Sequence, residues 1–347
     1  MNIHKSSFGK TETDVQIDLY KLTNDLGMKV GIITYGSIVA SIEVPDREGN
    51  VEDIVLGFDQ LEGYLKGNSP HFGGIIGRYA NRIKKGQFKI NGVEYHLTVN
   101  DGPNHLHGGF RGFDRVVWNA ESFETEDVVG VKLHYLSHDG EEGYPGDLSC
   151  MITYSLTNDN ALQMIYEATT NKPTPVNLTN HTYFNLASQS AGSVLNHELF
   201  VMADTYTPVD KNMIPVGDIR SVKNTPLDFT KPRKIGERID KMDKGYDHNL
   251  VLAKGDEKLD LAARVWEPTS GRAMEIHTTE PGVQFYTGNY LDGSVVGKDS
   301  TRYQPHGGFC LEMQHFPDSP NQSKFPSTIL NEGDKYTQFT LFKFYTS

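Results

Sequence analysis

The sequence predicts an all-β protein, a large antiparallel β-sandwich with very little helix. Many short segments alternate apolar and polar residues with period two, which is typical of half-buried strands. Two such segments are joined by Asn91 and Gly92, and an Asn-Gly pair is a strong signal for a two-residue hairpin turn. Strand and helix patterns do not alternate along the chain, which argues against a parallel α/β fold.

The expected strands follow one another through the chain. Residues 15–20 place alternate apolar side chains on one face, and residues 152–157 repeat this pattern. Residues 89–95 contain both arms of the hairpin, and we expect a type I′ turn because both of its central residues need positive φ. Further strands are predicted at residues 29–35, 39–44, 131–136, 162–169, 259–265, 273–278, 283–286, 309–313 and 336–345.

Helix is scarce, and only residues 59–65 and 232–239 have a helical pattern. The second of these segments has Pro232 in its first turn and spaces Ile235 and Ile239 four residues apart. Turn residues are spread through the chain, and no flexible linker or fixed-period repeat divides it. We therefore expect residues 1–347 to form a single sandwich domain.

The composition favours a small ligand over a macromolecular one. The chain has 347 residues, 37% of them hydrophobic, which is enough for a large core. It carries 45 acidic and 33 basic residues, a net charge of −12, without runs of like charge. This balance argues against nucleic acid or an anionic membrane as a partner. We expect a small neutral ligand and a monomer or weak homodimer.

The sequence also favours a cytoplasmic location. Residues 1–15 have no apolar stretch like that of a secretion signal, and no later segment is apolar for long enough to span a bilayer. The two cysteines, Cys150 and Cys310, are far apart in the chain. Neither a disulfide framework nor a cysteine zinc site is therefore expected.

Residues 175–186 (PVNLTNHTYFNL) place an ionisable ring among uncharged hydrogen-bonding neighbours. In an extended strand, His181 would share one polar face with Asn177, Thr179, Tyr183 and Asn185. Such a face can line a cleft for a hydroxyl-rich ligand, with His181 as the proton donor. The alternative is a structural histidine whose hydrogen bonds are satisfied within the core.

Residues 307–314 (GGFCLEMQ) form a second informative segment. An alternating strand here puts three apolar side chains on one face and Glu312 on the other, between Cys310 and Gln314. Because Gly308 and Cys310 are small, we expect room for a ligand beside Glu312. The alternative is an ordinary solvated carboxylate.

Three further segments have the composition of loops that carry polar side chains: residues 77–82 (GRYANR), 104–112 (NHLHGGFRG) and 245–249 (GYDHN). His105 and His107 could supply two metal ligands, with His181 as a third, but no acidic residue follows at close spacing. We expect no metal and no cofactor. The glycine-rich segments lack the strand-loop-helix context of a phosphate-binding loop. Asp247 is either delivered to a strand edge or simply forms a turn.

Six motifs occur in a fixed order through most of the chain. They are GRYANR at 77–82, NHLHGG at 104–109, GYPG at 143–146, NLTNHTYFNL at 177–186, YDHN at 246–249 and FCLEMQ at 309–314, the last followed by FPDSPNQ. Together they resemble the galactose mutarotase family, also called aldose 1-epimerase, from about Gly36 to the C-terminus. Met313, His315 and Phe316 depart from the family pattern beside the last motif.

The resemblance implies a single large β-sandwich that binds a sugar in a cleft on a concave sheet face. It also implies Glu312 as general base and His181 as general acid. The implied reaction interconverts the α and β anomers of a free hexose such as D-galactose or D-glucose, and it needs neither metal nor redox cofactor. The residues implied to hold the sugar are Asn81, Arg82, His107, Asp247 and Gln284.

Three other functional classes remain open. A glycoside hydrolase or lyase would use paired carboxylates, here Asp247 and Glu312. A phosphosugar epimerase would need basic side chains for the phosphate, and Arg78, Arg82 and Arg111 are candidates. A non-catalytic sugar-binding module would keep the polar cleft without needing an acid and a base.

Overall fold

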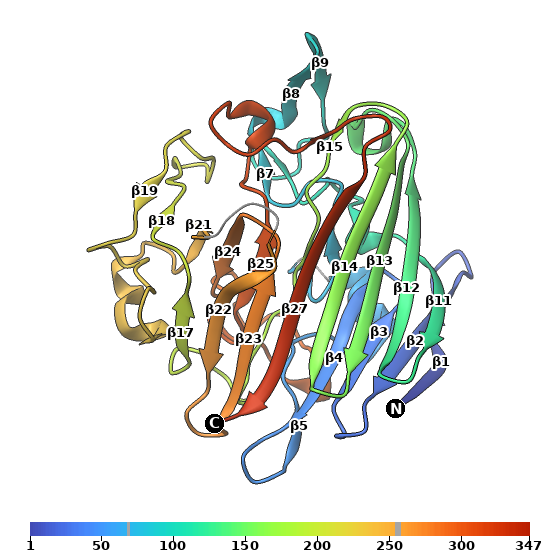
Figure 1. Ribbon diagram of the computed structural model, residues 1–347, viewed down its shortest axis with the longest axis vertical. Coiled ribbons are helices and arrows are strands. Elements are labelled where there is room, and N and C mark those ends of the chain that lie inside the picture. The colour runs from blue at the N-terminus through green and yellow to red at the C-terminus, as the bar shows by residue number, and fades with distance from the viewer. Residues whose placement is uncertain (68–69, 254–257) are drawn as a thin grey trace.

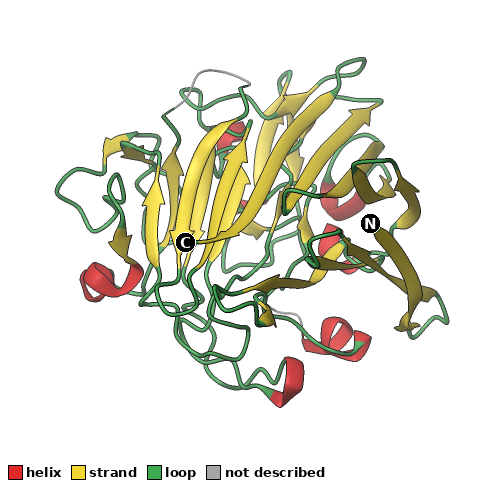
Figure 2. Ribbon diagram, turned by 60° about the horizontal axis from the view of Figure 1, so that its bottom comes forward, coloured by secondary structure: helices red, strands yellow, loops and turns green. Residues whose placement is uncertain are grey.

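The computed structural model describes residues 1–67, 70–253 and 258–347. Strands dominate the molecule, and its helical segments are short (Figures 1 and 2). The largest sheet has nine antiparallel strands. In spatial order these are β11 (Asn119–Glu124), β12 (Val128–Ser137), β13 (Leu148–Thr157), β14 (Ala161–Thr170), β27 (Tyr336–Thr346), β23 (Arg272–Thr278), β22 (Asp260–Trp266), β17 (Glu198–Val201) and β20 (Arg233–Lys234).

Two five-stranded antiparallel sheets accompany the large sheet. The N-terminal sheet contains β1 (Asn2–Lys10), β2 (Gln16–Thr23), β3 (Lys29–Ile33), β4 (Ile38–Pro45) and β5 (Val51–Asp53). The second sheet has the order β19 (Arg220–Ser221), β18 (Thr205–Tyr206), β21 (Asp247–Val251), β24 (Gly282–Tyr286) and β25 (Cys310–Gln314). Short ladders pair β10 (His105–Leu106) with β7 (Arg82–Ile83), β15 (Thr174–Pro175) with β26 (Ile329–Leu330), β16 (Thr179–Asn180) with β6 (Ile75–Ile76), and β8 (Gln87–Ile90) with β9 (Val93–His96).

The main core lies between the large sheet and the two smaller ones. One buried cluster contains Ile32 from β3, Tyr154 from β13, Ile276 from β23 and Phe285 from β24. In Figure 1 the strands of the N-terminal sheet lie behind β12, β13 and β14. Sheets that pack face to face around a shared apolar layer make a sandwich. The all-β sandwich prediction is therefore confirmed.

Every predicted strand other than that of residues 175–186 is present, with its ends shifted. The confirmed strands are β2, β3, β4, β12, β13, β14, β22, β23, β24, β25 and β27. The predicted hairpin is formed by β8 and β9, in which Ile90 pairs with Val93 across a two-residue turn. Asn91 has φ 51° and Gly92 has φ 82°, the left-handed values that a type I′ turn requires.

The helical segments differ from the predictions. Helix α1 (Leu61–Gly67) begins two residues later than predicted, and Asp59 accepts a hydrogen bond from the amide of Asp299 instead of starting the helix. The predicted α-helix at 232–239 is wrong, because Lys234 pairs with Glu198 of β17 and a 3-10 helix follows. The 3-10 helices are η1 (Lys84–Gly86), η2 (Phe113–Arg115), η3 (Glu141–Gly143), η4 (Ile235–Lys241), η5 (Lys298–Ser300) and η6 (Ser319–Asn321).

The prediction of one continuous strand at residues 175–186 is wrong. Its successive parts pair with different segments: Pro175 with Ile329, Thr179 with Ile76, and Phe184 with both Val55 and Phe309. These pairings make the segment a seam that connects β25 with the parts of the chain near the N-terminal sheet. Tertiary pairing outweighs the local alternation.

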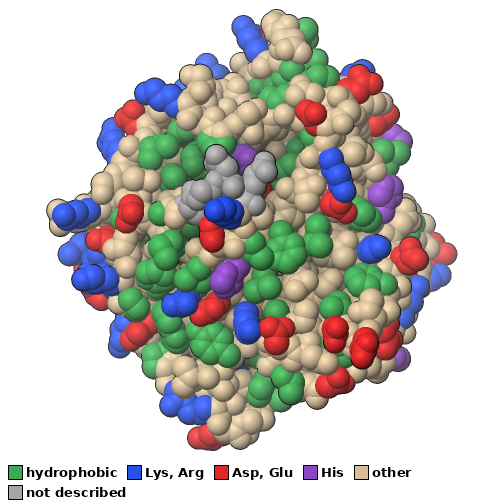
Figure 3. Space-filling view, viewed as in Figure 1, with side chains coloured by type: hydrophobic (Ala, Val, Ile, Leu, Met, Phe, Trp, Pro, Cys, Tyr) green, Lys and Arg blue, Asp and Glu red, His purple; other side chains and the backbone are tan. Residues whose placement is uncertain are grey.

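The surface carries mixed charge. On the face in Figure 3, acidic and basic side chains are interspersed. Within residues 1–67, 70–253 and 258–347, no helix has the length and apolar character needed to cross a bilayer.

Candidate active site

A cavity of about 690 Å³, counted with its open mouth, lies on the face of β25 opposite the main core. Of the residues that the resemblance implies, only Gln284 does not line it. The lining residues are Pro70, His71, Asn81, Arg82, Leu106, His107, His181, Tyr183, Asp247, Tyr286, Tyr290, Leu291 and Glu312.

Glu312 extends into the cavity from β25, while Leu311 and Met313 pack on the other face in the main core. The residue is 2% exposed. Among the residues that the structure describes, none hydrogen-bonds to Oε2, which is itself buried. Burial raises the pKa of Glu312 well above its ordinary value, and the negative charge of Asp247 raises it further, while Arg82 opposes the shift.

His181 is held by the turn at residues 71–74. Its amide donates to the carbonyl of Gly74 over 2.9 Å, and its carbonyl accepts from the amide of Gly73 over 3.0 Å. The ring stacks on Tyr183 with centroids 5.2 Å apart, and Nδ1 lies 3.5 Å from Sγ of Cys310. Burial lowers the pKa of His181 to about 3, because the charged imidazolium is poorly solvated in the cavity.

Nε2 of His181 lies 3.7 Å from Oε1 of Glu312. This separation is too long for a hydrogen bond, so neither group satisfies the other. Their pKa values shift in opposite directions, so when the pair shares one proton, burial favours that proton on Glu312 rather than on His181. Moving that proton to His181 yields a carboxylate and an imidazolium without changing the net charge. Such a pair can take a proton from one oxygen of a ligand and give one to another.

Asn81, Arg82 and His107 form one hydrogen-bonded corner of the cavity. Asn81 and His107 have left-handed φ values of 62° and 52°. The amide of His107 donates to the carbonyl of Asn81 over 3.1 Å, and the amide of Asn81 points to Nδ1 of His107 at 3.2 Å. Nε of Arg82 donates to Asp101 over 2.7 Å, which fixes the guanidinium at the wall.

His107 has a defined tautomer. Because Nδ1 accepts the amide N–H of Asn81, the neutral ring carries its proton on Nε2. Burial and the neighbouring positive charges lower the pKa of His107 well below its ordinary value. His107 is therefore a neutral hydrogen-bond donor.

Asp247 and Gln284 lie on adjacent strands, β21 and β24. Asp247 lines the cavity, whereas Gln284 lies behind it and donates from Nε2 to Oδ1 of Asp247 over 2.6 Å. In the register of the sheet, Gln284 pairs with both Asn249 and Glu312. Gln284 thus supports the carboxylate of Asp247 rather than forming the wall of the cavity.

The metal hypothesis from His105 and His107 is wrong in its ligand set. His105 is buried elsewhere, where Nδ1 donates to the carbonyl of Thr98 and Nε2 accepts from the hydroxyl of Tyr144, each over 2.6 Å. His107, His181 and Glu312 do have candidate ligand atoms within 4.8 Å of one another. A tetrahedral zinc site needs separations of roughly 3.4 Å, given bonds of about 2.1 Å. The tautomer of His107 leaves Nε2 without a lone pair, so these groups suit hydroxyl groups better than a metal.

Two further expectations from the sequence are corrected. Asn177 and Asn185 do not line the cavity, because their side-chain amides donate to backbone carbonyls, including those of His315 and Gly307. Gly308 does not leave room for a ligand: a methyl group there would lie 3.0–3.2 Å from Leu56 and Tyr183, so its small size serves packing.

The three arginines considered for a phosphate are not gathered in the cavity. The buried guanidinium of Arg78 donates to the carbonyls of Pro145, Gly146 and Ser137. Arg111 is exposed and does not line the cavity, so of the three only Arg82 does. This arrangement suits an uncharged ligand better than a phosphorylated one.

Part of the cavity wall was not predicted from the sequence. Tyr286 shares a face of β24 with Gln284, so period-two alternation could have indicated it. His71, Tyr290 and Leu291 lie in irregular connections, where no periodic signal exists. Pro70 and Leu106 were also missed.

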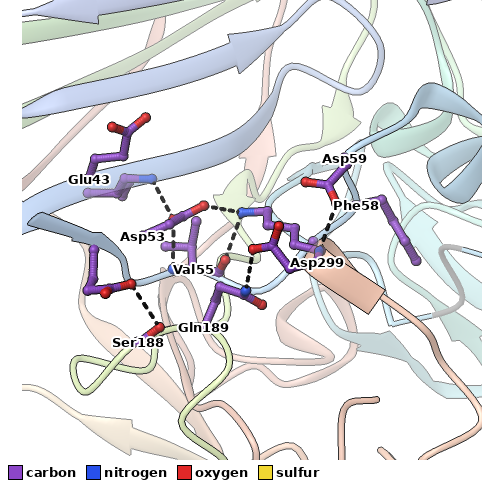
Figure 4. A network of polar contacts seen from close by, with 12 residues as sticks. Glu43, Asp53, Val55, Phe58, Asp59, Ser188, Gln189 and Asp299 are labelled. Carbon is purple, nitrogen blue, oxygen red and sulfur yellow. Dashed lines mark hydrogen bonds and ion pairs between the residues drawn. The ribbon is translucent and has the colours of Figure 1, made fainter. Parts of the chain in front are cut away.

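The connection between β24 and β25, which carries Tyr290 and Leu291, is anchored by an ion pair between the buried Lys298 and the half-buried Asp53. Nζ of Lys298 lies 2.6 Å from Oδ2 of Asp53 and donates to the carbonyl of Val55 over 2.8 Å. Figure 4 shows this network, in which Gln189 and Asp59 bond to Asp299 beside Lys298. The wall of the cavity thus depends on contacts with the N-terminal sheet.

Comparison with known proteins identifies the family of the chain. The model of the family described as aldose 1-epimerase matches residues 18–343. The chain is 47% identical to galactose mutarotase from Homo sapiens over 329 residues, which is 94% of each chain. It is 37% identical to aldose 1-epimerase from Escherichia coli strain K12 over 334 residues, again 94% of each chain.

Solved structures show the same fold. Galactose 1-epimerase from Lactobacillus acidophilus NCFM superposes with a TM-score of 0.88 at 28% identity, over 100% of this chain and 99% of that one. A GalM/aldose epimerase homologue from C. elegans gives a TM-score of 0.87 at 30% identity, over 94% and 98% of the two chains. The chain belongs to the aldose 1-epimerase family.

Proposed function

We propose that the protein interconverts the α and β anomers of free hexoses such as D-galactose and D-glucose, with Glu312 as general base and His181 as general acid. The observation that carries the proposal is the facing pair of Glu312 and His181, two buried side chains 3.7 Å apart at the wall of the cavity. The names of the relatives, galactose mutarotase and aldose 1-epimerase, support the choice of substrate.

Ring opening uses the pair in its charged form. Glu312 takes the proton of the C1 hydroxyl as O1 becomes a carbonyl oxygen, the bond between C1 and the ring oxygen breaks, and Nε2 of His181 gives its proton to the ring oxygen. The open aldehyde then rotates about C1–C2. On reclosure His181 takes back its proton and Glu312 returns one to O1, so each group acts in both directions.

The opposite pKa shifts fit this cycle. After ring opening, Glu312 holds a proton and His181 is neutral, which is the distribution that burial favours in the free protein. Before ring opening the proton must be on His181. Hydrogen bonds from sugar hydroxyls to Glu312 and the charge of Arg82 favour its carboxylate form.

The remaining polar groups of the cavity hold the sugar ring. Asp247 accepts hydrogen bonds from hydroxyl groups, and Arg82 and the Nε2–H of His107 donate to hydroxyl oxygens. Asn81 forms the backbone corner between them. Together they would present C1 to Glu312, which lowers the barrier by positioning.

Polarimetry tests the proposal. Freshly dissolved α-D-galactose should relax to its equilibrium rotation at a rate proportional to protein concentration, and the final rotation should be unchanged. Relaxation at the rate of buffer alone would overturn the proposal. A glycoside hydrolase or lyase would instead release a product from a glycoside, and a binding module would bind galactose without accelerating relaxation.

A chelator tests the metal-free mechanism. Dialysis against EDTA should leave the relaxation rate unchanged. Loss of activity that returned with zinc would place a metal among His107, His181 and Glu312, because His105 is engaged elsewhere.

We further propose that residues 1–347 form one domain, which is supported by a core cluster with side chains from all three large sheets. The cytoplasmic location and the monomeric or weakly dimeric state remain predictions.

A further inference from the structure

We propose that His71 is an additional sugar-binding residue, and that the buried carboxylate of Asp114 positions it so that Nε2 bonds to a ring hydroxyl group. This inference rests on the proposed function. It assigns a role to a part of the cavity wall that the acid, the base and the other sugar contacts do not use. The observations that carry it are a hydrogen bond to a buried carboxylate, a strained turn and a cluster of rings.

A hydrogen bond to Asp114 fixes one edge of the His71 ring. Nδ1 lies 2.8 Å from Oδ2 of Asp114, whose side chain is only 1% exposed. Burial alone would raise the pKa of Asp114, but the neighbouring His71 and Arg115 outweigh it, so the pKa is lowered. An ionised carboxylate accepts the N–H at Nδ1. Nε2 is thus the nitrogen that His71 can offer to a ligand.

The backbone is shaped to hold this pair. His71 has φ 63°, a left-handed value that is uncommon for a residue other than glycine. The same turn hydrogen-bonds on both sides to the backbone of His181, through Gly73 and Gly74. A methyl group at Gly74 would lie 2.6 Å from Cβ of Asp114. Gly74 therefore lets the carboxylate approach the ring while the turn stays bonded to His181.

The ring of His71 lies beside two other histidine rings of the cavity. Its centroid is 5.0 Å from that of His107 and 5.9 Å from that of His181. His71 also lines the cavity, with 15% of its side chain exposed. In the neutral ring Nε2 accepts a hydrogen bond, whereas His107 donates one. Nε2 of His71 can therefore accept a hydrogen bond from one hydroxyl group of the sugar, while the Nε2–H of His107 donates to a hydroxyl oxygen.

The substitution His71→Asn isolates Nε2. The amide of Asn can replace Nδ1 as the donor to Asp114, and Asn tolerates left-handed φ. We expect KM for D-galactose to rise about five- to tenfold, as for one lost hydrogen bond, with kcat changed less than about twofold. His4→Asn, at an exposed position on β1, is the matched control and should change neither.

Deoxygalactoses identify the contact. KM for the 2-, 3-, 4- and 6-deoxy sugars is measured with His71→Asn and with wild type. The ratio of the two KM values should remain high for three of the analogues. It should fall to about one for the fourth, because that analogue lacks the hydroxyl group that His71 binds. An equal ratio for every analogue, or no rise in KM with D-galactose, would overturn the proposal.

Asp114→Asn tests the positioning role. Asp114→Asn alone should raise KM for D-galactose. In the His71→Asn background it should cause no further rise, because both substitutions remove the same contact with the sugar. Additive effects, or a lower thermal midpoint with unchanged KM, would mean a structural role only.

Binding of 1,5-anhydro-D-galactitol, which cannot mutarotate, should weaken in parallel with KM. Wild-type protein that bound this compound without accelerating mutarotation would refute the proposed function and not this contact.

Discussion

Gln284 donates a hydrogen bond of 2.6 Å from Nε2 to Oδ1 of Asp247, and it lies behind that carboxylate. The side chain of Gln284 is buried on β24, between Asp247 and the strand that carries Glu312. A carboxylate that lines a cavity needs such a donor to keep one orientation. The relationship makes Gln284 a positioning residue for the Asp247 carboxylate at the wall of the cavity.

We expect Gln284→Met to weaken sugar binding. Met has a similar length but no donor, so the carboxylate of Asp247 loses its support. KM for D-galactose should rise about five- to tenfold with kcat within about threefold of wild type. Gln16→Met, at an exposed position on β2, is the control for the same replacement. An unchanged KM would show that Asp247 keeps its position without Gln284.

Glu312→Gln should abolish most turnover while binding is retained. The amide keeps the shape of the side chain but cannot take the C1 hydroxyl proton. We expect kcat to fall at least about a hundredfold, with the dissociation constant of 1,5-anhydro-D-galactitol changed much less. Glu121→Gln, at an exposed position on β11, should behave as wild type. Near-normal turnover of the Glu312 variant would mean that another group takes the proton.

The pH profile of kcat/KM should be broad. The free pair is active with one proton, so activity is lost on the acid side when a second proton reaches His181, whose pKa burial lowers to about 3. On the alkaline side activity is lost when the single proton leaves Glu312, whose pKa burial raises. Rate measurements across pH should thus show no acid limb near the ordinary pKa of histidine, about 6.5. An acid limb there would contradict this scheme.

His181→Asn separates the catalytic role of His181 from a structural one. The variant should lower kcat strongly and remove the alkaline limb, because the shared proton no longer has an acceptor that can pass it to the ring oxygen. The fold should survive, since a polar replacement faces the cavity. Turnover and thermal midpoint are measured on the same preparation. A destabilised but fully active enzyme would end the catalytic proposal.

Much of this fold could be predicted because strand alternation and turn chemistry are local. The hairpin at Asn91 and Gly92 and the two faces of β25 follow from residue order alone. The segment around His181 could not be predicted in this way. Its backbone pairs with partners far along the chain, including Ile76 and Phe309, and only tertiary structure specifies them.

The candidate site likewise contains residues that the sequence indicates and residues that it does not. Glu312 and His181 carry a chemical signal in their own segments, and the motif resemblance adds Asn81, Arg82 and Asp247. His71 gave no signal, because it becomes part of the wall only through the strained turn and the distant carboxylate of Asp114. Residues in irregular connections acquire function through contacts that periodicity does not encode.

Lys298→Met should destabilise the protein and loosen the wall of the cavity. It leaves the half-buried carboxylate of Asp53 without its cation, which should lower the free energy of unfolding by less than the about 3–5 kcal/mol typical of a fully buried pair. The connection that carries Tyr290 and Leu291 loses its anchor, so KM for D-galactose should rise as well. Adding Asp53→Asn should recover part of the free energy of unfolding, measured with urea. No recovery in the double variant would mean that the ion pair is not the source of the loss.

The buried His105 should make the protein sensitive to acid. Burial lowers the pKa of His105 from 6.5 to about 4, so between these values the unfolded chain binds more protons than the folded one. Stability is therefore lost as pH falls through this window, by roughly 3 kcal/mol for a shift of this size.

His105→Gln removes the titration, so it should be less stable than wild type at pH 7 but lose less stability on acidification. Carboxyl groups with raised pKa values, such as Glu312, act in the opposite direction in both proteins and cancel in the comparison. Urea unfolding at pH 7 and pH 4.5 gives the free energy of unfolding of wild type and of His105→Gln at each pH. His4→Asn is the exposed control. A difference that stayed constant with pH would show that His105 is not the sensitive group.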